Sequence, residues 1–112
     1  MDLCYRNFNE VLTQYYMVSL IEYLDTLFQI KFIHQEKNKN QNIQKLYIVA
    51  TTEMNQAFSC CKNSEHKVKY EQYLKEINLT LHLLTQEIPC RELAEEKLKN
   101  LRYVEKEILK LI

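Results

Sequence analysis

Apolar residues recur along this chain at intervals of three and four positions, which is the period of an amphipathic α-helix. The clearest case is residues 42–61, where these intervals place one apolar stripe on a single helical face. The stripe consists of Ile43, Leu46, Tyr47, Ala50, Met54, Ala57, Phe58 and Cys61. A face this wide is unstable in water on its own, so the stripe predicts a helix over residues 42–62 that packs against partner helices.

Residues 9–33 carry a second and broader apolar face, with Glu10, Glu22 and Asp25 predicted to point outward. A face this broad suits a helix that contacts more than one partner, including another subunit. Its predicted inward positions are Val11, Leu12, Tyr15, Leu20, Leu24, Leu27 and Phe28.

Two more helices are predicted over residues 65–86 and 89–111. Asn63 or Ser64 can cap the first of these, and Pro89 marks the start of the second because proline is tolerated in a first helical turn. The inward positions of residues 65–86 are Tyr70, Tyr73, Leu74, Ile77, Leu81 and Leu84, with a second line at Leu79 and Leu83. Those of residues 89–111 are Leu93, Ala94, Leu98, Leu101, Val104 and Ile108.

The connections between these segments set the topology. Residues 34–41 (HQEKNKNQ) form a strongly polar run and are predicted to be the longest connection, and residues 1–8 carry no sustained stripe and are predicted to be a frayed lead-in. Short connections make neighbouring helices antiparallel. The chain is therefore predicted to be one domain, residues 1–112, with an all-α fold: an up-down-up-down antiparallel four-helix bundle.

Composition agrees with this fold and narrows the function. The chain has no glycine and one proline, which argues against hairpins and glycine-rich phosphate loops. Fifteen basic and fifteen acidic residues give a net charge of zero, so a nucleic-acid site would have to be a local patch.

The longest charge-free runs, residues 11–21 and 77–86, fall short of the roughly 20 residues that span a bilayer. With no signal peptide, and four cysteines without metal-finger spacing, the chain is predicted to be cytoplasmic.

Candidate catalytic and metal-binding patterns are weak. A di-iron bundle needs Glu-x-x-His on two helices, yet Lys31, Asn63 and Leu79 stand three residues before the three histidines. A cysteine nucleophile paired with His66 would need an orienting third group, and thiols at a helix end are more often packing groups. No metal, no cofactor, no small-molecule substrate and no enzymatic activity are expected.

The charged residues leave two interpretations open. Lys62, Lys67 and Lys69 surround the turn between the second and third helices, with Lys75 further along, and clustered lysines can bind phosphates. Acidic neighbours at positions 65, 71 and 76 equally fit an ordinary solvated face. The fourth helix alternates six basic residues with five acidic ones, as a salt-bridged outer face does. The eight tyrosines could stack bases or pack in a core or subunit interface.

Residues 20–112 resemble a known bacterial family. The resemblance rests on Lys31-Phe32 before the polar run, on the spacing of Ile43, Leu46, Ile48 and Ala57, and above all on residues 73–84 (YLKEINLTLHLL). The family comprises the ribosomal-RNA intervening-sequence proteins and the accessory variability determinants of diversity-generating retroelements. The resemblance implies a barrel-like homopentamer of four-helix bundles that binds a reverse transcriptase and template RNA, supports mutagenic retrohoming and performs no chemistry itself.

The chain departs from the family pattern at three places. Asn78 and His82 stand where arginines are common in the family's third helix, Ile33 replaces a proline, and the end of the chain lacks a Gly-Gly-Trp run. The lost arginines bear on RNA binding more than on fold or assembly. The residues predicted to contact nucleic acid or a protein partner are Lys62, Lys67, Lys69, Lys75 and Arg102. The alternative is an oligomeric helical adaptor that has protein partners only.

Overall fold

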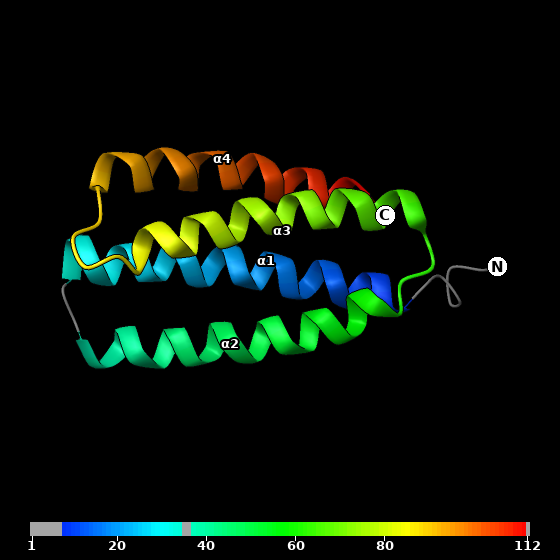
Figure 1. The fold of residues 1–112 in the computed structure, drawn as a ribbon, viewed down its shortest axis with the longest axis horizontal. Helices are drawn as coiled ribbons and strands as arrows, with labels where there is room; N and C mark the ends of the chain where they lie inside the picture. The colour runs from blue at the N-terminus through cyan, green and yellow to red at the C-terminus, as the bar shows by residue number, and fades with distance from the viewer. Residues whose placement is uncertain (1–7, 35–36, 112) are drawn as a thin grey trace.

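The computed structural model describes residues 8–34 and 37–111. Within these ranges the chain forms antiparallel helices and no strand, which confirms the predicted all-α bundle (Figure 1). The elements are α1 (Phe8–Gln29), the π-helix η2 (Ile30–His34), α2 (Lys37–Ser59), α3 (Ser64–Leu84) and α4 (Arg91–Lys110). The bundle is elongated, with principal extents of 49 × 24 × 18 Å.

The helix ends differ from prediction mainly around the polar run. Residues 34–41 were expected to be a loop, but α2 already begins at Lys37. The expectation was wrong because polarity does not oppose helix formation, and lysine and glutamine are good helix formers. The first helix continues past Gln29 as a π-helix to His34. The predicted lead-in lies outside the described residues except for Phe8, which is the first residue of α1.

The remaining boundaries shift by a few residues. The second helix ends at Ser59 and the fourth starts at Arg91, directly after Pro89 and Cys90. Asn63 caps α3 as predicted, because its side-chain oxygen accepts a hydrogen bond from the backbone N–H of His66 at 3.1 Å. This bond satisfies one of the unpaired N–H groups of the first helical turn.

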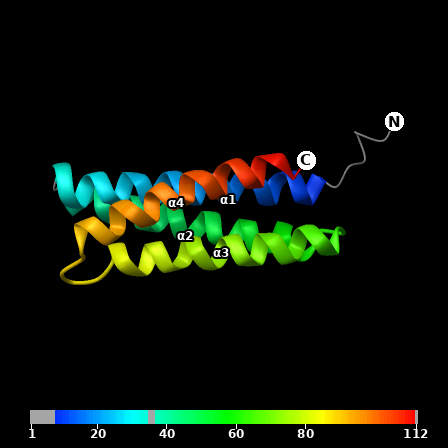
Figure 2. The same cartoon turned by 90° about the horizontal axis from the view of Figure 1, so that it is seen from above.

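Helix α1 is the centre of the bundle. It packs against α2, α3 and α4, whereas α2 lies mainly against α1, as the two perpendicular views show (Figures 1 and 2). Helices α1 and α3 are therefore in direct contact. The fully buried residues Met17, Leu20, Ile21 and Leu24 form the middle of α1. The chain is thus organised around its first helix, although the second has the cleaner pattern.

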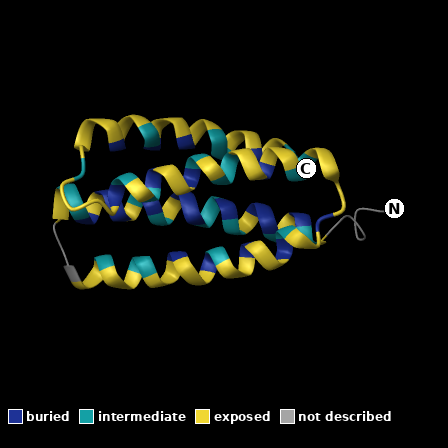
Figure 3. Ribbon diagram, in the orientation of Figure 1, coloured by how far each residue is buried: buried dark blue, intermediate teal, exposed yellow. Residues whose placement is uncertain are grey.

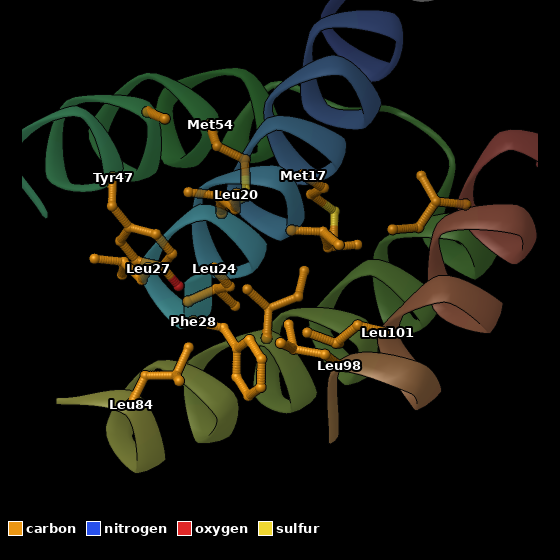
Figure 4. Close-up of a cluster of buried hydrophobic side chains, with 14 of the residues drawn as sticks. Met17, Leu20, Leu24, Leu27, Phe28, Tyr47, Met54, Leu84, Leu98 and Leu101 are labelled. Carbon is orange, nitrogen blue, oxygen red and sulfur yellow. The ribbon is translucent and has the colours of Figure 1, made fainter. Parts of the chain in front are cut away.

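The core draws side chains from every helix (Figure 4). Leu20, Leu24 and Leu27 of α1 face Tyr47 and Met54 of α2. Seven further members of the cluster come from α3 and α4 and close the opposite side of α1. They are Tyr70, Ile77, Leu84, Ala94, Leu98, Leu101 and Ile108.

Several positions face the other way from the sequence prediction. The expected inward residues Val11 and Tyr15 are 45% and 65% exposed, and the expected outward Glu10 is buried. The reason lies in the rotation of α1 about its axis. The face that carries Glu10, Gln14 and Met17 packs against the other three helices, and Val11 and Tyr15 therefore lie on the opposite face. Further predicted core positions that are exposed are Leu46, Leu79 and Leu93.

Candidate functional site

A buried polar cluster closes the end of the bundle where α1 begins. The Tyr70 hydroxyl donates a hydrogen bond to a Glu10 carboxylate oxygen at 2.8 Å, and the same oxygen is bonded to Nδ1 of His66. The Gln14 amide nitrogen donates to the Tyr70 hydroxyl at 3.0 Å and to the backbone carbonyl of Ile108 at 2.8 Å. One continuous chain of bonds therefore links α1, α3 and α4.

The cluster supplies hydrogen-bond partners to a carboxyl group that would otherwise be costly to bury. A buried polar group is tolerated when it is hydrogen-bonded, and the Glu10 oxygen is bonded both to the Tyr70 hydroxyl and to Nδ1 of His66. Burial, and then the bond to Glu10, raise the pKa of the Tyr70 hydroxyl. Tyr70 is thus a hydrogen-bond donor that holds Glu10 in place. The arrangement is more typical of a structural hydrogen-bond network than of a catalytic site.

The cysteines near this end also fit a packing role. Cys61 is buried, with its sulfur 3.4 Å from the hydroxyl of Thr13 and 3.6 Å from the carbonyl of Ala57. Burial raises the pKa of the Cys61 thiol, and a protonated thiol is a poor nucleophile. Among the described residues, no group of three or more His, Cys, Asp or Glu side chains could hold a metal ion.

Three of the five predicted binding residues, Lys62, Lys67 and Lys69, lie at or close to the α2–α3 turn. Lys62 and Lys69 are exposed, and Lys67 is partly buried, with its ammonium 3.5 Å from the carbonyl of Ser59. Lys75 is also exposed, but it lies two turns further along α3 than Lys69. The structure therefore places a small basic group at the end of the bundle, outside the buried cluster.

Arg102 does not join this group. Its guanidinium is 3.0 Å from Asp25 of α1 and 3.1 Å from Glu105 of its own helix. A second contact, between Lys97 and Glu76 at 4.0 Å, connects α4 to α3. These pairs support the prediction of a salt-bridged fourth helix, and they commit the charge of Arg102 to the α1–α4 contact.

The helices expose apolar side chains in surroundings of different charge. Helix α1 has three charged residues in 22 and α2 has four in 23, against eleven in 20 for α4. Helix α4 also exposes Leu93, Tyr103 and Leu109, but charged neighbours surround them, and the ammonium of Lys106 lies 6.0 Å from the ring centre of Tyr103. The exposed apolar residues of α1 and α2 are Phe8, Val11, Tyr15, Leu46, Ile48 and Val49.

Exposed positions run along both α2 and α4 (Figure 3), so the number of charged residues, and not the degree of exposure, distinguishes these two kinds of surface. Sequence reasoning anticipated a broad apolar face on the first helix, but it assigned Val11 and Tyr15 to the core. It also missed the cluster of Glu10, Gln14 and His66. A signal was present, because positions 10 and 14 are in helical phase with the buried Met17 and Ile21.

None of the helices that the structure describes is long and apolar enough to cross a membrane. The resemblance to the intervening-sequence and accessory-determinant family rests on its residues alone: comparison of the chain with family models, curated proteins and solved structures found no match.

Proposed function

We propose that this chain is a non-enzymatic cytoplasmic protein that assembles with copies of itself into a ring and serves as a binding platform. The observation that carries the proposal is the low charge of α1 and α2 together with the six large apolar residues that they expose. Interface centres are depleted in charged residues and enriched in aromatic ones. An exposed apolar surface of this kind on a soluble domain marks an interaction site.

A second copy is the proposed occupant of this surface. Helix α3 exposes Val68 and Leu79 at 55% and 52%, and these two side chains are the proposed apolar contacts of the second copy. Contact between two different surfaces of identical chains produces a ring when the rotation closes. The resemblance implies five copies, and this number is part of the proposal.

The test is the molar mass in solution by light scattering, over a dilution series. The unmodified chain is expected to assemble, and Tyr15→Glu is expected to shift it towards monomer because a carboxylate would be buried in the contact. Tyr103→Glu is the matched control, since Tyr103 is 63% exposed and Tyr15 is 65% exposed. A monomer at every concentration for the unmodified chain would refute the proposal.

The platform is proposed to bind a reverse transcriptase and its template RNA, in line with the family resemblance. The supporting observation is the group of Lys62, Lys67 and Lys69 at one end of the bundle, which symmetry would repeat around a ring. Lys75 extends this group along α3, and Arg102 would contribute only if it exchanged its carboxylate partners for phosphate.

RNA binding is tested by filter retention at several salt concentrations. Replacing Lys62, Lys67 and Lys69 with glutamine is expected to lower affinity. It is also expected to reduce the slope of log K against log salt by roughly 0.7 for each phosphate that a lysine no longer neutralises. Replacement of Lys97, Lys99 and Lys106 on α4 is the control. Absence of binding by the unmodified chain at low salt would leave the alternative, an adaptor with protein partners only.

A further inference from the structure

A small apolar hollow lies at the end of the bundle opposite the polar cluster. It opens between α1, η2 and the first turns of α2 and has a volume of about 200 Å³. Ile30 and Ile43 provide its aliphatic lining, and the rim is polar. The rim residues are Thr26, Gln29, His34, Lys39 and Asn42. Pockets for small molecules usually measure about 300–1,000 Å³, so this hollow suits one inserted side chain better than a cofactor.

A side chain of matching chemistry projects from the same end of the molecule. Ile88, in the turn between α3 and α4, is 89% exposed, more than any other large apolar residue in the described part of the chain. An aliphatic group held almost wholly in water gains from any apolar contact that covers it.

The turn that carries Ile88 is held in place at its α3 end. Thr85 closes α3 through its backbone N–H, which donates to the carbonyl of Leu81 at 2.9 Å. The ammonium of Lys31, on η2, donates to the carbonyl of Leu84 and to that of Gln86 at 3.3 Å. Pro89 restricts the backbone of the residue before it. The turn therefore holds the backbone of Ile88 in place before binding, and this lowers the entropy lost on binding.

The hollow and the turn are formed by different helices at one end of the bundle. The hollow lies between α1, η2 and α2, whereas the turn joins α3 to α4 (Figures 1 and 2). We infer that Ile88 of one copy inserts into the hollow of the next copy. Because both features lie at one end, rotation about an axis along the helices brings them together without a shift along that axis, which favours a closed ring.

This inference rests on the proposed self-assembly and names a residue pair that drives it. In this assembly Lys31, the first residue of the Lys31-Phe32 pair, has the role of fixing the turn that carries Ile88. It also assigns a role to η2: this segment supplies Ile30 and His34 to the hollow. π-Helical turns are frequent at functional sites.

The first experiment compares dissociation constants for self-association by sedimentation. Ile88→Asp is expected to weaken assembly by at least about tenfold, because a desolvated carboxylate replaces a buried aliphatic group, whereas Ile88→Leu is expected to keep it. Leu109→Asp on α4 is the control for an added surface charge, since Leu109 is also exposed. Circular dichroism of each variant checks that the bundle is folded.

The second experiment is a mixed cross-link. One chain carries Ile88→Cys and another carries Asn42→Cys, both with Cys4, Cys60 and Cys90 replaced by serine. Oxidation is expected to give a disulfide-linked dimer in the mixture and not with either chain alone. If the unmodified chain assembles, yet Ile88→Asp assembles equally well and no mixed dimer forms, this inference is overturned while the proposed function stands. A purely monomeric unmodified chain overturns both.

Discussion

Helices α1 and α4 solve the same packing problem in different ways. Helix α4 buries one stripe, Ala94, Leu98, Leu101 and Ile108, and surrounds its exposed Leu93, Tyr103 and Leu109 with eleven charged residues in 20. Helix α1 buries residues that face three partners, yet it still exposes Phe8, Val11 and Tyr15. Both helices expose three large apolar residues, and they differ in the charge around them: α1 has three charged residues in 22, whereas α4 has eleven in 20. This difference supports the proposed contact at α1 and α2 over one at α4.

The largest expected effect tests the central position of α1. Leu24→Ala is expected to lower the free energy of unfolding by about 2–5 kcal/mol, because it removes a side chain that is wholly buried among three helices. Leu109→Ala, at an exposed position of α4, is expected to change it by less than about 0.5 kcal/mol. Urea unfolding measures both. Equal losses for the two variants would contradict the described packing.

The next effect concerns the polar cluster that joins α1 to α3 and α4. Tyr70→Phe removes one donor from the buried Glu10 carboxylate and is expected to destabilise the fold by about 1–3 kcal/mol. Tyr103→Phe, on the charged surface of α4, is expected to be neutral. A double-mutant cycle with Glu10→Gln isolates the coupling between Glu10 and Tyr70. A coupling energy of zero would show that the bond contributes nothing.

Alkaline pH provides a third test. Burial raises the pKa of Tyr47, whose hydroxyl donates to Asn78 at 2.9 Å, and burial together with Glu10 raises the pKa of Tyr70. Tyrosine in an unfolded chain loses its proton near pH 10, whereas these folded groups keep theirs. Stability is therefore complete below pH 10 and falls above it, by up to about 1.4 kcal/mol per pH unit for each tyrosine.

Tyr47→Phe and Tyr70→Phe are each expected to make this alkaline loss shallower, as measured by urea unfolding between pH 9 and pH 11. Tyr103→Phe is the control, because Tyr103 is exposed. An unchanged slope in both core variants would mean that the two hydroxyls ionise in the folded protein as they do in the unfolded one.

The smallest effect belongs to the surface of α4. Arg102→Gln breaks the contacts with Asp25 and Glu105 and is expected to reduce stability by at most about 1 kcal/mol, since all three side chains are partly exposed. The loss is expected to shrink further in high salt. A loss of several kcal/mol that does not depend on salt would show that α4 is held by this ion pair and not by its apolar stripe.

The fold was predictable from the sequence because each of the four predicted helices repeats the three-and-four spacing of apolar residues, and no strand pattern competes with it. The stripes of α2 and α4 identified Tyr47, Met54, Leu98 and Leu101 as core residues. On α1 the prediction was right for Leu20, Leu24, Leu27 and Phe28, but it failed near the start of the helix, where apolar residues lie all round and no polar face fixes the rotation. Glu10 and Tyr15 were therefore assigned to the wrong sides, and only the positions of three neighbouring helices decide between them.

The candidate surfaces were harder to predict for a related reason. The lysines around the α2–α3 turn are close in sequence, so their proximity in space was expected. Arg102 and Asp25 are distant in sequence, and the packing of α4 against α1 decides that they pair. The Ile88 turn and the hollow come together only between copies, so no pattern within one chain reveals the contact.

The most direct measurement of the central claim is hydroxyl-radical footprinting of Tyr15 and Tyr103 as the protein concentration rises. The two tyrosines are almost equally exposed in the single chain, at 65% and 63%, so their ring oxidation should be similar at high dilution. Assembly through the exposed apolar residues of α1 and α2 predicts that oxidation of Tyr15 falls with concentration while that of Tyr103 stays constant. Constant oxidation of Tyr15, or an equal fall at both positions, would contradict it.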